Sequence, residues 1–587
     1  SIEMNGMCSN AQTISDKIFY LNNIRNLIIG TDVLVSAIEG EGINITGTLS
    51  FGGIANKTLY TGDNIYLKST ATATANVADI TGNVISGKVT VERYVNTGLL
   101  ADGRHPKSWQ FLAAPTKGQT IFQSWQENGT ILPGFGTIIT GTGNGFDITT
   151  AQPSMKFFDP ATGSEGNWIG VTNTGNNIQD PRGYMLFVRG DRSVTTSNGT
   201  PNPTTLRTKG SLFQPTDAPP STNVLPGKLA SVGNPYASAI DISYMAGNGS
   251  FVNLDNNVIV WDPLLNGSFN LGGYQALSAA NNYEPTAGGT SYYPAGVASP
   301  FIQSGQAFFV RSSGQAGSVT FSEACKTASN RLVNRSGLQG RRRYFRATLF
   351  TSTGIIADGN AVVFDNDYRN RIDENDALKI SNSGENVGIL KEGRLLAVDA
   401  RGRIEQRDSI FYSTCNLRIQ SYRFCFSPKN MSVEGLRAYL VDTYLQTRTS
   451  ISLVDSSWVN FTITQDPSSA SPTRFYVVFK ISEQKKNISI RSVENISMNK
   501  SQPKICVYPN PIVNNCIRLQ CRNVLTGKYQ IQLLNNAGQV LFREILWINE
   551  SNALKMLKMV KNIPPGDYLI QLINPVGDKQ TISVFFQ

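Results

Sequence analysis

Short runs of alternating apolar and polar residues, bounded by glycine, asparagine or proline, recur along most of the chain. Tyr529, Ile531 and Leu533 alternate with two glutamines, which is the two-residue period of a half-buried strand. Turn sequences such as Pro-Pro-Gly-Asp at 564–567 separate runs of this kind. The pattern predicts an all-β chain of several domains.

The region 1–104 carries strands rich in glycine, threonine and asparagine at a spacing of about 20 residues. Examples are the segments 24–30, 43–49, 65–68 and 89–95. Near-regular strands of this kind predict a β-solenoid-like region of stacked rungs, with a plain sandwich as the alternative.

The region 105–330 contains a diverged duplication, with copy one at 105–220 and copy two at 221–330. In each copy an apolar strand runs into Asp-Pro, and a glycine opens an aromatic strand that ends in arginine. The landmarks that recur in the same order are Phe111–Pro115, Phe157–Pro160 and Gly183–Arg189 in copy one, and Val232–Pro235, Val260–Pro263 and Gly305–Arg311 in copy two. The sequence therefore predicts tandem β-modules packed as a pair.

Two further domains follow, each after a polar stretch without periodicity. The linkers are 331–343 and 483–503, and the domain between them, 344–482, is expected to be a β-sandwich. The last domain, 504–587, has the length and turn punctuation of an immunoglobulin-like β-sandwich.

Four features of this last domain occur in order: Tyr-Pro-Asn-Pro at the opening, an Asn-x-x-Gly-x-Val hairpin, a Gly-x-Tyr-x-Ile strand and a lysine-bearing last strand. Together they resemble the type A C-terminal sorting domain of the type IX secretion system of Bacteroidota. The residues that carry the resemblance are Tyr508, Pro509, Asn510, Pro511, Gly538, Gly566, Tyr568 and Lys579. The resemblance implies export through the periplasm and outer membrane to the cell surface, with the secretion machinery as partner. The remainder is similar to uncharacterised adhesion and gliding-associated substrates of that system.

The seven cysteines include no Cys-x-x-Cys pair, so a zinc or redox motif is not expected. Cys415 and Cys425 are candidates for a bridge between neighbouring strands, and Cys506, Cys516 and Cys521 allow one more. An exported protein can hold such bridges.

The only histidine is His105, which removes most serine, cysteine and metal-hydrolase mechanisms. The net charge of +10 favours anionic surfaces, but the one dense basic run, 341–343, is interpreted as a solvated linker edge and nucleic acid is not an expected partner. No stretch reaches the ~20 apolar residues of a transmembrane helix. The first residues do not form a signal peptide, which indicates a mature or trimmed form.

Closely spaced oxygen side chains in 365–376 fit Ca²⁺, with a solvated acidic loop as the alternative. The candidate ligands are Asp365, Asp367, Asp373 and Asp376. Separately, Asp408-Ser409-Ile410 resembles the O-glycan acceptor sequence of exported Bacteroidota proteins, with Ser409 as the acceptor.

Four tryptophans lie in the duplicated region: Trp109, Trp125, Trp168 and Trp261. Core packing is the favoured interpretation, and stacking on sugar rings is the alternative. Glycosidase chemistry needs only two carboxylates, so the sequence leaves it open.

Two hypotheses follow for function. The first is a non-enzymatic, extracellular adhesion or structural protein that assembles with itself into a filament. The alternative is a secreted carbohydrate-binding or carbohydrate-active protein with a surface glycan as partner.

Overall fold

The computed structural model confirms an all-β, multi-domain chain with a β-solenoid-like region. It describes residues 1–5, 11–16, 18–36, 41–53, 55–95, 107–178, 181–196, 198–290, 292–327, 342–405, 408–433, 435–481, 504–508, 512, 516–522, 524–535, 539–550, 553–558 and 563–586. Two compact units result, Ser1–Gln484 and Lys485–Gln587. Within the described ranges, no helix has the length and hydrophobicity needed to span a membrane.

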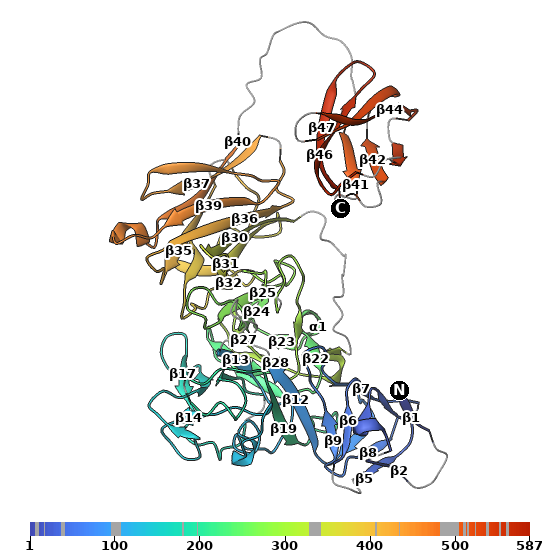
Figure 1. Ribbon diagram of the computed structural model, residues 1–587. Coiled ribbons are helices and arrows are strands. Elements are labelled where there is room, and N and C mark those ends of the chain that lie inside the picture. Colours follow the sequence, from blue (N-terminus) through green and yellow to red (C-terminus); the bar gives the residue numbers. More distant parts are fainter. Residues whose placement is uncertain are drawn as a thin grey trace. The chain divides into compact units, whose positions relative to one another are not determined.

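The chain begins with three parallel sheets that form the sides of a solenoid (blue in Figure 1). The strands of the first side are β1 (Ile2–Met4), β4 (Leu27–Ile29), β7 (Thr48–Phe51) and β10 (Asn76–Val77). Those of the second are β2 (Gln12–Ser15), β5 (Val33–Ser36), β8 (Thr58–Tyr60) and β11 (Val84–Ser86). Those of the third are β3 (Asn23–Ile24), β6 (Ile43–Ile45), β9 (Ile65–Leu67) and β12 (Val89–Val95).

Each rung places aliphatic side chains directly above those of the rung before it. On the third side, for example, Ile45 pairs with Ile24 and with Leu67, and all three are buried. A rung cannot bury these side chains alone, so the stack is held together by contacts between neighbouring rungs.

The two ends of the stack differ. At the last rung, β12 pairs antiparallel with β19 (Thr204–Gly210), a strand from the copy-one stretch, so the expected boundary at 104/105 does not separate the sheets. At the first rung, β1, β2 and β3 pair on one side only among the described strands. An antiparallel strand therefore covers one edge of the solenoid.

The two modules each contain a four-stranded antiparallel sheet. The strands of copy one are β13 (Ser108–Leu112), β16 (Met155–Asp159), β17 (Asn167–Gly170) and β18 (Tyr184–Val188). Those of copy two are β21 (Leu229–Gly233), β24 (Asn257–Asp262), β25 (Gly273–Ser278) and β27 (Ala307–Arg311). When the four strands of each copy are numbered in chain order, they lie side by side in the order first, fourth, second, third in both sheets. A duplication requires such a shared topology.

The pairing register differs between the copies by two residues. In copy one, Phe111 pairs with Met185. The corresponding residues of the repeated phrases in copy two are Ser231 and Ala307, but Ser231 pairs with Phe309 instead. Because the side-chain period of a strand is two, this shift leaves the same face of each strand in the core.

The smaller elements of this region surround the two sheets. They are β14 (Thr140–Gly141), β15 (Ile148–Thr149), β20 (Ser221–Val224), β22 (Ala239–Asp241), β23 (Phe251–Val252), β26 (Phe301–Ile302), β28 (Gly317–Thr320), β29 (Lys326–Thr327), the helix α1 (Ile242–Gly247) and the 3₁₀ helices η2 (Glu127–Gly129) and η3 (Glu323–Cys325). Outside this region are η1 (Tyr20–Asn22) in the solenoid and η4 (Pro467–Ala470) in the next domain. The Asp241 carboxylate caps α1 by accepting hydrogen bonds from the backbone N–H of Ser243 and Tyr244.

The next domain is a sheet of eleven strands that encloses one hydrophobic core. Its strands are β30 (Arg343–Thr351), β31 (Ile356–Phe364), β32 (Ala377–Leu378), β33 (Asn386–Lys391), β34 (Arg394–Arg401), β35 (Ser409–Cys415), β36 (Ser421–Lys429), β37 (Leu436–Asp442), β38 (Thr447–Ile451), β39 (Ser457–Thr462) and β40 (Phe475–Ile481). Phe461 of β39 packs edge-on against Phe475 of β40, with 4.8 Å between ring centroids. The opposite ends of the strand order therefore meet in one core, as in a sandwich.

The C-terminal unit has two antiparallel sheets around its own core. One sheet contains β41 (Lys504–Tyr508), β42 (Cys516–Arg522) and β45 (Ala553–Lys558). The other contains β43 (Gly527–Leu534), β44 (Val540–Ile548), β46 (Gly566–Ile573) and β47 (Lys579–Phe586). This is the antiparallel β-sandwich that the strand pattern predicts.

Candidate functional site

A cleft of about 290 Å³ lies where the two module sheets meet the segment after β32. Its lining is mostly aromatic and comprises Trp109, Lys156, Phe158, Glu165, Gly166, Asn167, Trp168, Met185, Leu229, Trp261, Tyr274, Phe309, Ile380, Ser381 and Ser383. A concave, aromatic-lined space with a few polar groups at a domain junction has the character of a ligand site.

Strand pairing explains why the aromatic residues gather here. Trp168 lies opposite Phe158, so both side chains point to the same face of the copy-one sheet. That face packs on the copy-two sheet through Phe309, whose ring lies 4.8 Å from Phe158 and 5.5 Å from Trp168. The indole N–H of Trp168 donates a hydrogen bond to the hydroxyl of Tyr274 at 3.1 Å. The aromatic wall is therefore fixed by both modules.

The cleft is lined by one basic and one acidic side chain, and only the acidic one has an ion-pair partner among the described residues. The Lys156 ammonium lies 5.1 Å from the ring centroid of Trp109, and it has no ion pair within the described ranges. Glu165 pairs with Arg311 at 2.6 Å. An adjoining cavity of about 360 Å³ shares Glu165 with the cleft and is also lined by Arg394.

Among the described residues that line the cleft, Glu165 is the single carboxylic acid. Glycoside hydrolysis uses two carboxyl groups on either side of the scissile bond. The described lining of the cleft therefore offers one of the two carboxyl groups that this chemistry uses.

The four tryptophans divide into two pairs. Trp125 and Trp261 are buried, and the indole N–H of Trp261 donates to the backbone carbonyl of Trp109 at 2.7 Å. Trp109 and Trp168 are half-buried and line the cleft. Core packing thus describes the first pair, and the second pair keeps accessible ring surface.

The candidate calcium ligands do not form one set. Within the described ranges, no three His, Cys, Asp or Glu side chains gather as a metal ion would need. Asp365 pairs with Arg342 at 3.3 Å, and Asp365 and Asp367 line a cavity together with Arg342, Arg343 and Arg403. Arginines therefore occupy the neighbourhood in which a cation was expected.

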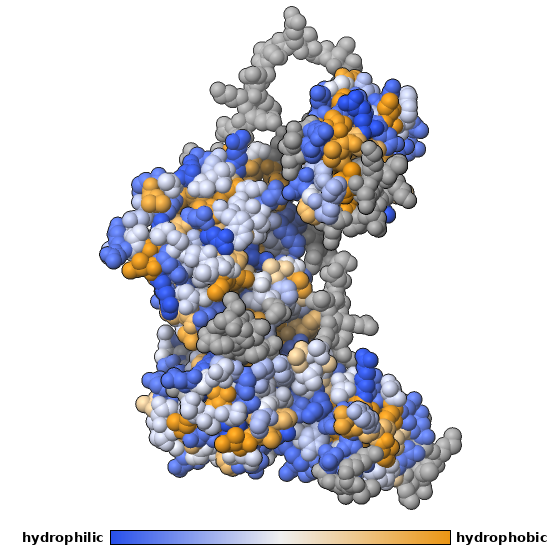
Figure 2. Space-filling view, viewed as in Figure 1, coloured by the Kyte–Doolittle hydropathy of each residue, from blue (hydrophilic) through white to orange (hydrophobic). Residues whose placement is uncertain are grey.

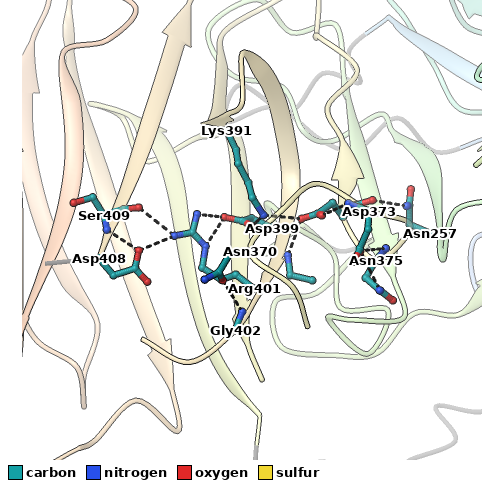
Figure 3. A network of polar contacts seen from close by, with 12 residues as sticks. Asn257, Asn370, Asp373, Asn375, Lys391, Asp399, Arg401, Gly402, Asp408 and Ser409 are labelled. Carbon is teal, nitrogen blue, oxygen red and sulfur yellow. Dashed lines mark hydrogen bonds and ion pairs between the residues drawn. The ribbon is translucent and has the colours of Figure 1, made fainter. Parts of the chain in front are cut away.

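Asp373 and Asp376 belong to a different network, drawn in Figure 3. Asp376 accepts from the backbone N–H of Asp373 at 2.9 Å and of Ala400 at 3.0 Å, and Lys391 lies 3.7 Å away. Burial raises the pKa of Asp376 to about 7. The carboxylate is therefore held by the protein's own donors.

The same network reaches the predicted glycan acceptor, as Figure 3 shows. Lys391 pairs with Asp399 at 2.8 Å, Asp399 pairs with Arg401, and Arg401 contacts Asp408 at 3.1 Å. Arg401 also donates to the backbone carbonyl of Ser409 at 3.1 Å. Basic and acidic side chains therefore alternate from Lys391 to Asp408. Ser409 is the half-buried first residue of β35.

The predicted bridge between Cys415 and Cys425 is wrong. Both thiols are free, with Cys415 exposed and Cys425 buried. They lie on β35 and β36, which do not pair with each other. Nearness in sequence did not translate into strand adjacency, because the sheet order separates these strands. Cys521 is also free, and the side chains of Cys506 and Cys516 lie outside the described part.

The residues of the sorting-domain resemblance are spread over the C-terminal unit. Tyr508 ends β41, Gly566 opens β46 and Lys579 opens β47. The Tyr568 hydroxyl donates to the backbone carbonyl of Pro564 at 3.0 Å, and its ring packs edge-on against Phe586. The segment 509–511, Gly538 and His105 lie outside the described residues.

Hydrophobic surface is visible on the C-terminal unit in Figure 2. Within this unit, large apolar side chains that are at least half exposed are Leu525, Ile545, Trp547, Met556 and Val576. Ile545 and Trp547 lie on β44, which pairs only with β43 among the described strands. Sequence reasoning missed this strand as a surface, because its apolar residues do not alternate with polar ones: only Arg543 and Glu544 interrupt the apolar run Val540–Ile548.

Comparison with known families gives one match. Residues 144–348 match a domain of unknown function (DUF8693), which spans most of both modules and the start of β30. No curated protein matches the sequence. The family description assigns no activity.

Similarity to solved structures is weak. The tetra-tandem repeat in the extending region of a large adhesion protein aligns with 9% identity over 75% of this chain and 93% of that chain, at a TM-score of 0.13. PorZ, a surface component of the type IX secretion system of Porphyromonas gingivalis, aligns with 10% identity over 74% of this chain and 68% of that chain, at a TM-score of 0.12. Scores this low support no conclusion about fold or function.

Proposed function

We propose that the chain is a non-enzymatic, extracellular surface protein of the adhesion or structural class, exported by the type IX secretion system. The observation that carries the proposal is the C-terminal unit, a compact sandwich with its own core that bears the four ordered features of a sorting domain. A signal that acts as a folded domain needs such an independent unit.

The non-enzymatic part of the proposal rests on chemistry. The cleft holds a single carboxylic acid among its described lining residues, and the sequence contains one histidine, which removes most mechanisms that use imidazole as a base or metal ligand. A chain that consists of a solenoid, two modules and a sandwich also provides length and surface area from simple β elements.

Export is tested in a Bacteroidota host that has the secretion system. Deletion of 504–587 should leave the protein in the periplasm, and fusion of 485–587 to a periplasmic reporter should bring the reporter to the surface. The Trp547→Ala variant of the full chain probes the exposed strand β44, with the Trp458→Ala variant of the same chain as control; the two side chains are 60% and 52% exposed. Normal surface display of the truncated chain would refute the proposal.

Self-assembly is a second candidate, favoured by the first rung of the solenoid. The strands β1, β2 and β3 each present one edge without a partner among the described strands. Such edges accept another strand, and a head-to-tail contact that does not close produces a fibre.

Electron microscopy of the purified chain at high concentration tests this candidate. Filaments that disappear when proline replaces Thr13 of β2 would support it, because proline removes a ladder donor from that edge. Dispersed particles at every concentration would refute it.

A further inference from the structure

The cleft between the modules has features that the proposed surface role does not use. Its two accessible indoles, Trp109 and Trp168, lie on β13 and β17, the outer strands of one sheet, and their rings share a face of that sheet. The floor is closed by Phe158 and Phe309, which are buried. The site is thus a concave apolar surface whose base is formed by buried rings.

The polar groups stand at the rim of this surface. Asn167 and Ser381 are exposed, and the side-chain N–H groups of Asn167 form no hydrogen bond within the described ranges. Glu165 is 54% exposed while it holds Arg311. A ligand that fits needs an apolar face for the indoles and hydrogen-bonding groups around its edge, because it would cover these polar groups and must replace the hydrogen bonds that they make with water.

A pyranose ring has this combination: C–H bonds form its faces and hydroxyl groups form its edge. The volume of about 290 Å³ is at the small end for ligand pockets, which fits one ring rather than an extended oligosaccharide. The size and the arrangement of the groups therefore select a single sugar unit, such as the end of a glycan chain.

The charge of the site narrows the class of ligand further. Lys156 faces the cleft with an ammonium that no described carboxylate neutralises, and Arg394 extends the positive region into the adjoining cavity. Glu165 is the one acid of the lining, and Arg311 pairs with it. A partner of opposite charge is favoured at such a site.

We propose that this cleft binds one carboxylated pyranose, stacked on Trp109 and Trp168 with its carboxylate paired to Lys156. Uronic acids and sialic acids share this chemistry and are distinguished by experiment. The inference concerns the Ser1–Gln484 unit and does not depend on how the chain is exported, so it stands or falls separately from the proposed function.

The test titrates each sugar into the purified full chain and measures binding by calorimetry at constant ionic strength. The probes are glucuronic acid, galacturonic acid and N-acetylneuraminic acid, with glucose and galactose as neutral counterparts. One of the acids is expected to bind at least ~10-fold more tightly than the neutral sugars, a difference of about 1.4 kcal/mol.

Variants separate the two parts of the site. Lys156→Gln should remove the preference for the acid, and Lys156→Arg should restore most of it. The exposed Lys209→Gln variant, which alters β19 away from the cleft, is the matched control. Trp168→Phe should weaken binding of acidic and neutral sugars alike, whereas Trp458→Phe should leave it unchanged.

Thermal unfolding of each variant shows whether it is folded before its binding is interpreted. The proposal is overturned if no acid binds saturably, if acidic and neutral sugars bind equally, or if Lys156→Gln retains the preference in a folded protein. Retention of full affinity in folded Trp168→Phe would overturn the stacking arrangement.

Discussion

The two β-modules share a strand order but occupy different positions in the fold. Copy two supplies the centre of the shared core: Phe309 is fully buried and contacts Phe111, Phe158 and Trp168. Copy one places Trp168 at the edge of that core, where the ring keeps accessible surface. The two modules therefore share a topology but differ in how deeply equivalent parts are buried.

The aspartates that end the second strand of each copy show the same contrast. Asp262 is fully buried and accepts hydrogen bonds from Gln275 at 2.7 Å and Thr290 at 2.8 Å. Asp159 lies at the surface, where its carboxylate accepts from the Thr162 hydroxyl at 2.7 Å. The repeated Asp-Pro phrase thus performs two different local tasks, and its recurrence in sequence does not imply equal environments.

The largest expected effect is at the centre of the shared core. Phe309→Ala should destabilise the Ser1–Gln484 unit by about 3–5 kcal/mol, because it removes a buried ring with several aromatic neighbours. Met185→Ala, at the position that pairs equivalently in copy one, should cost less. Urea unfolding of both variants makes the comparison, and an equal loss would contradict the assignment of the centre to copy two.

The second-largest effect is expected in the polar network around the buried Asp262. Asp262→Ala should cost about 2–3 kcal/mol, because Gln275 and Thr290 would keep buried donors without an acceptor. Asp159→Ala, whose donors can turn to water, should give a clearly smaller change in the same denaturation experiment. Equal effects would show that burial does not separate the two aspartates.

The glycines that open the repeated aromatic strands should respond to alanine for different reasons. A Cβ on Gly183 would lie 2.5 Å from Ser231 Oγ and 2.6 Å from Ala307 Cβ, so crowding should cost about 1–3 kcal/mol. Gly305 has a φ of +69°, and the atom nearest to an added Cβ would be Cδ of the flexible Arg93 side chain at 3.2 Å, so Gly305→Ala should cost about 1–2 kcal/mol chiefly through backbone strain.

A second substitution distinguishes crowding from strain. Ser231→Ala removes the nearest oxygen and should recover part of the stability lost in Gly183→Ala, while it should not help Gly305→Ala. Thermal unfolding of the four variants measures this, and rescue of Gly305→Ala would contradict the distinction.

The smallest expected effects are pH dependences of opposite sign. Burial raises the pKa of Asp262 to about 6, so the folded state holds the proton between about pH 4 and 6 when the unfolded chain has released it. Its contribution to stability is therefore lost as the pH rises through that window. Hydrogen bonds from Thr162 and Ala161 lower the pKa of Asp159, so its contribution is lost as the pH falls below about 4.

Substitution with asparagine tests both signs. The stability advantage of the wild type over Asp262→Asn should shrink from pH 4 to pH 6, and its advantage over Asp159→Asn should shrink from pH 5 to pH 3. Urea midpoints at each pH provide the measurement, and parallel curves for the two variants would contradict the difference in environment.

Much of the fold is legible in the sequence because strands leave a local pattern. The aliphatic residues of 43–49 and 65–68 predict solenoid rungs, and Ile45 and Leu67 do stack in neighbouring rungs. The repeated phrases around Phe111 and Val232 predict two related modules, and the two sheets share one strand order.

Pairings between distant segments are not visible in this pattern. Strand β19 caps the solenoid although it lies in the copy-one stretch, and the cysteines at 415 and 425 lie on strands that do not pair. Whether a metal ion or a lysine lies beside an acidic side chain depends in the same way on which strand packs next to it. Asp376, which lies 3.7 Å from Lys391, is an example.

The sequence by itself determined the all-β class, the rungs, the duplication and the ordered features of the last domain, because each depends on residues within a few positions of one another. The tertiary structure alone decided which tryptophans are accessible. Trp109, Trp168 and Phe309 belong to two modules, and only the stacking of those modules brings them to one cleft. Lys156 is one lysine among many in the sequence, and it becomes a candidate ligand-binding group because strand pairing within copy one places it over Trp109 without a carboxylate partner among the described residues.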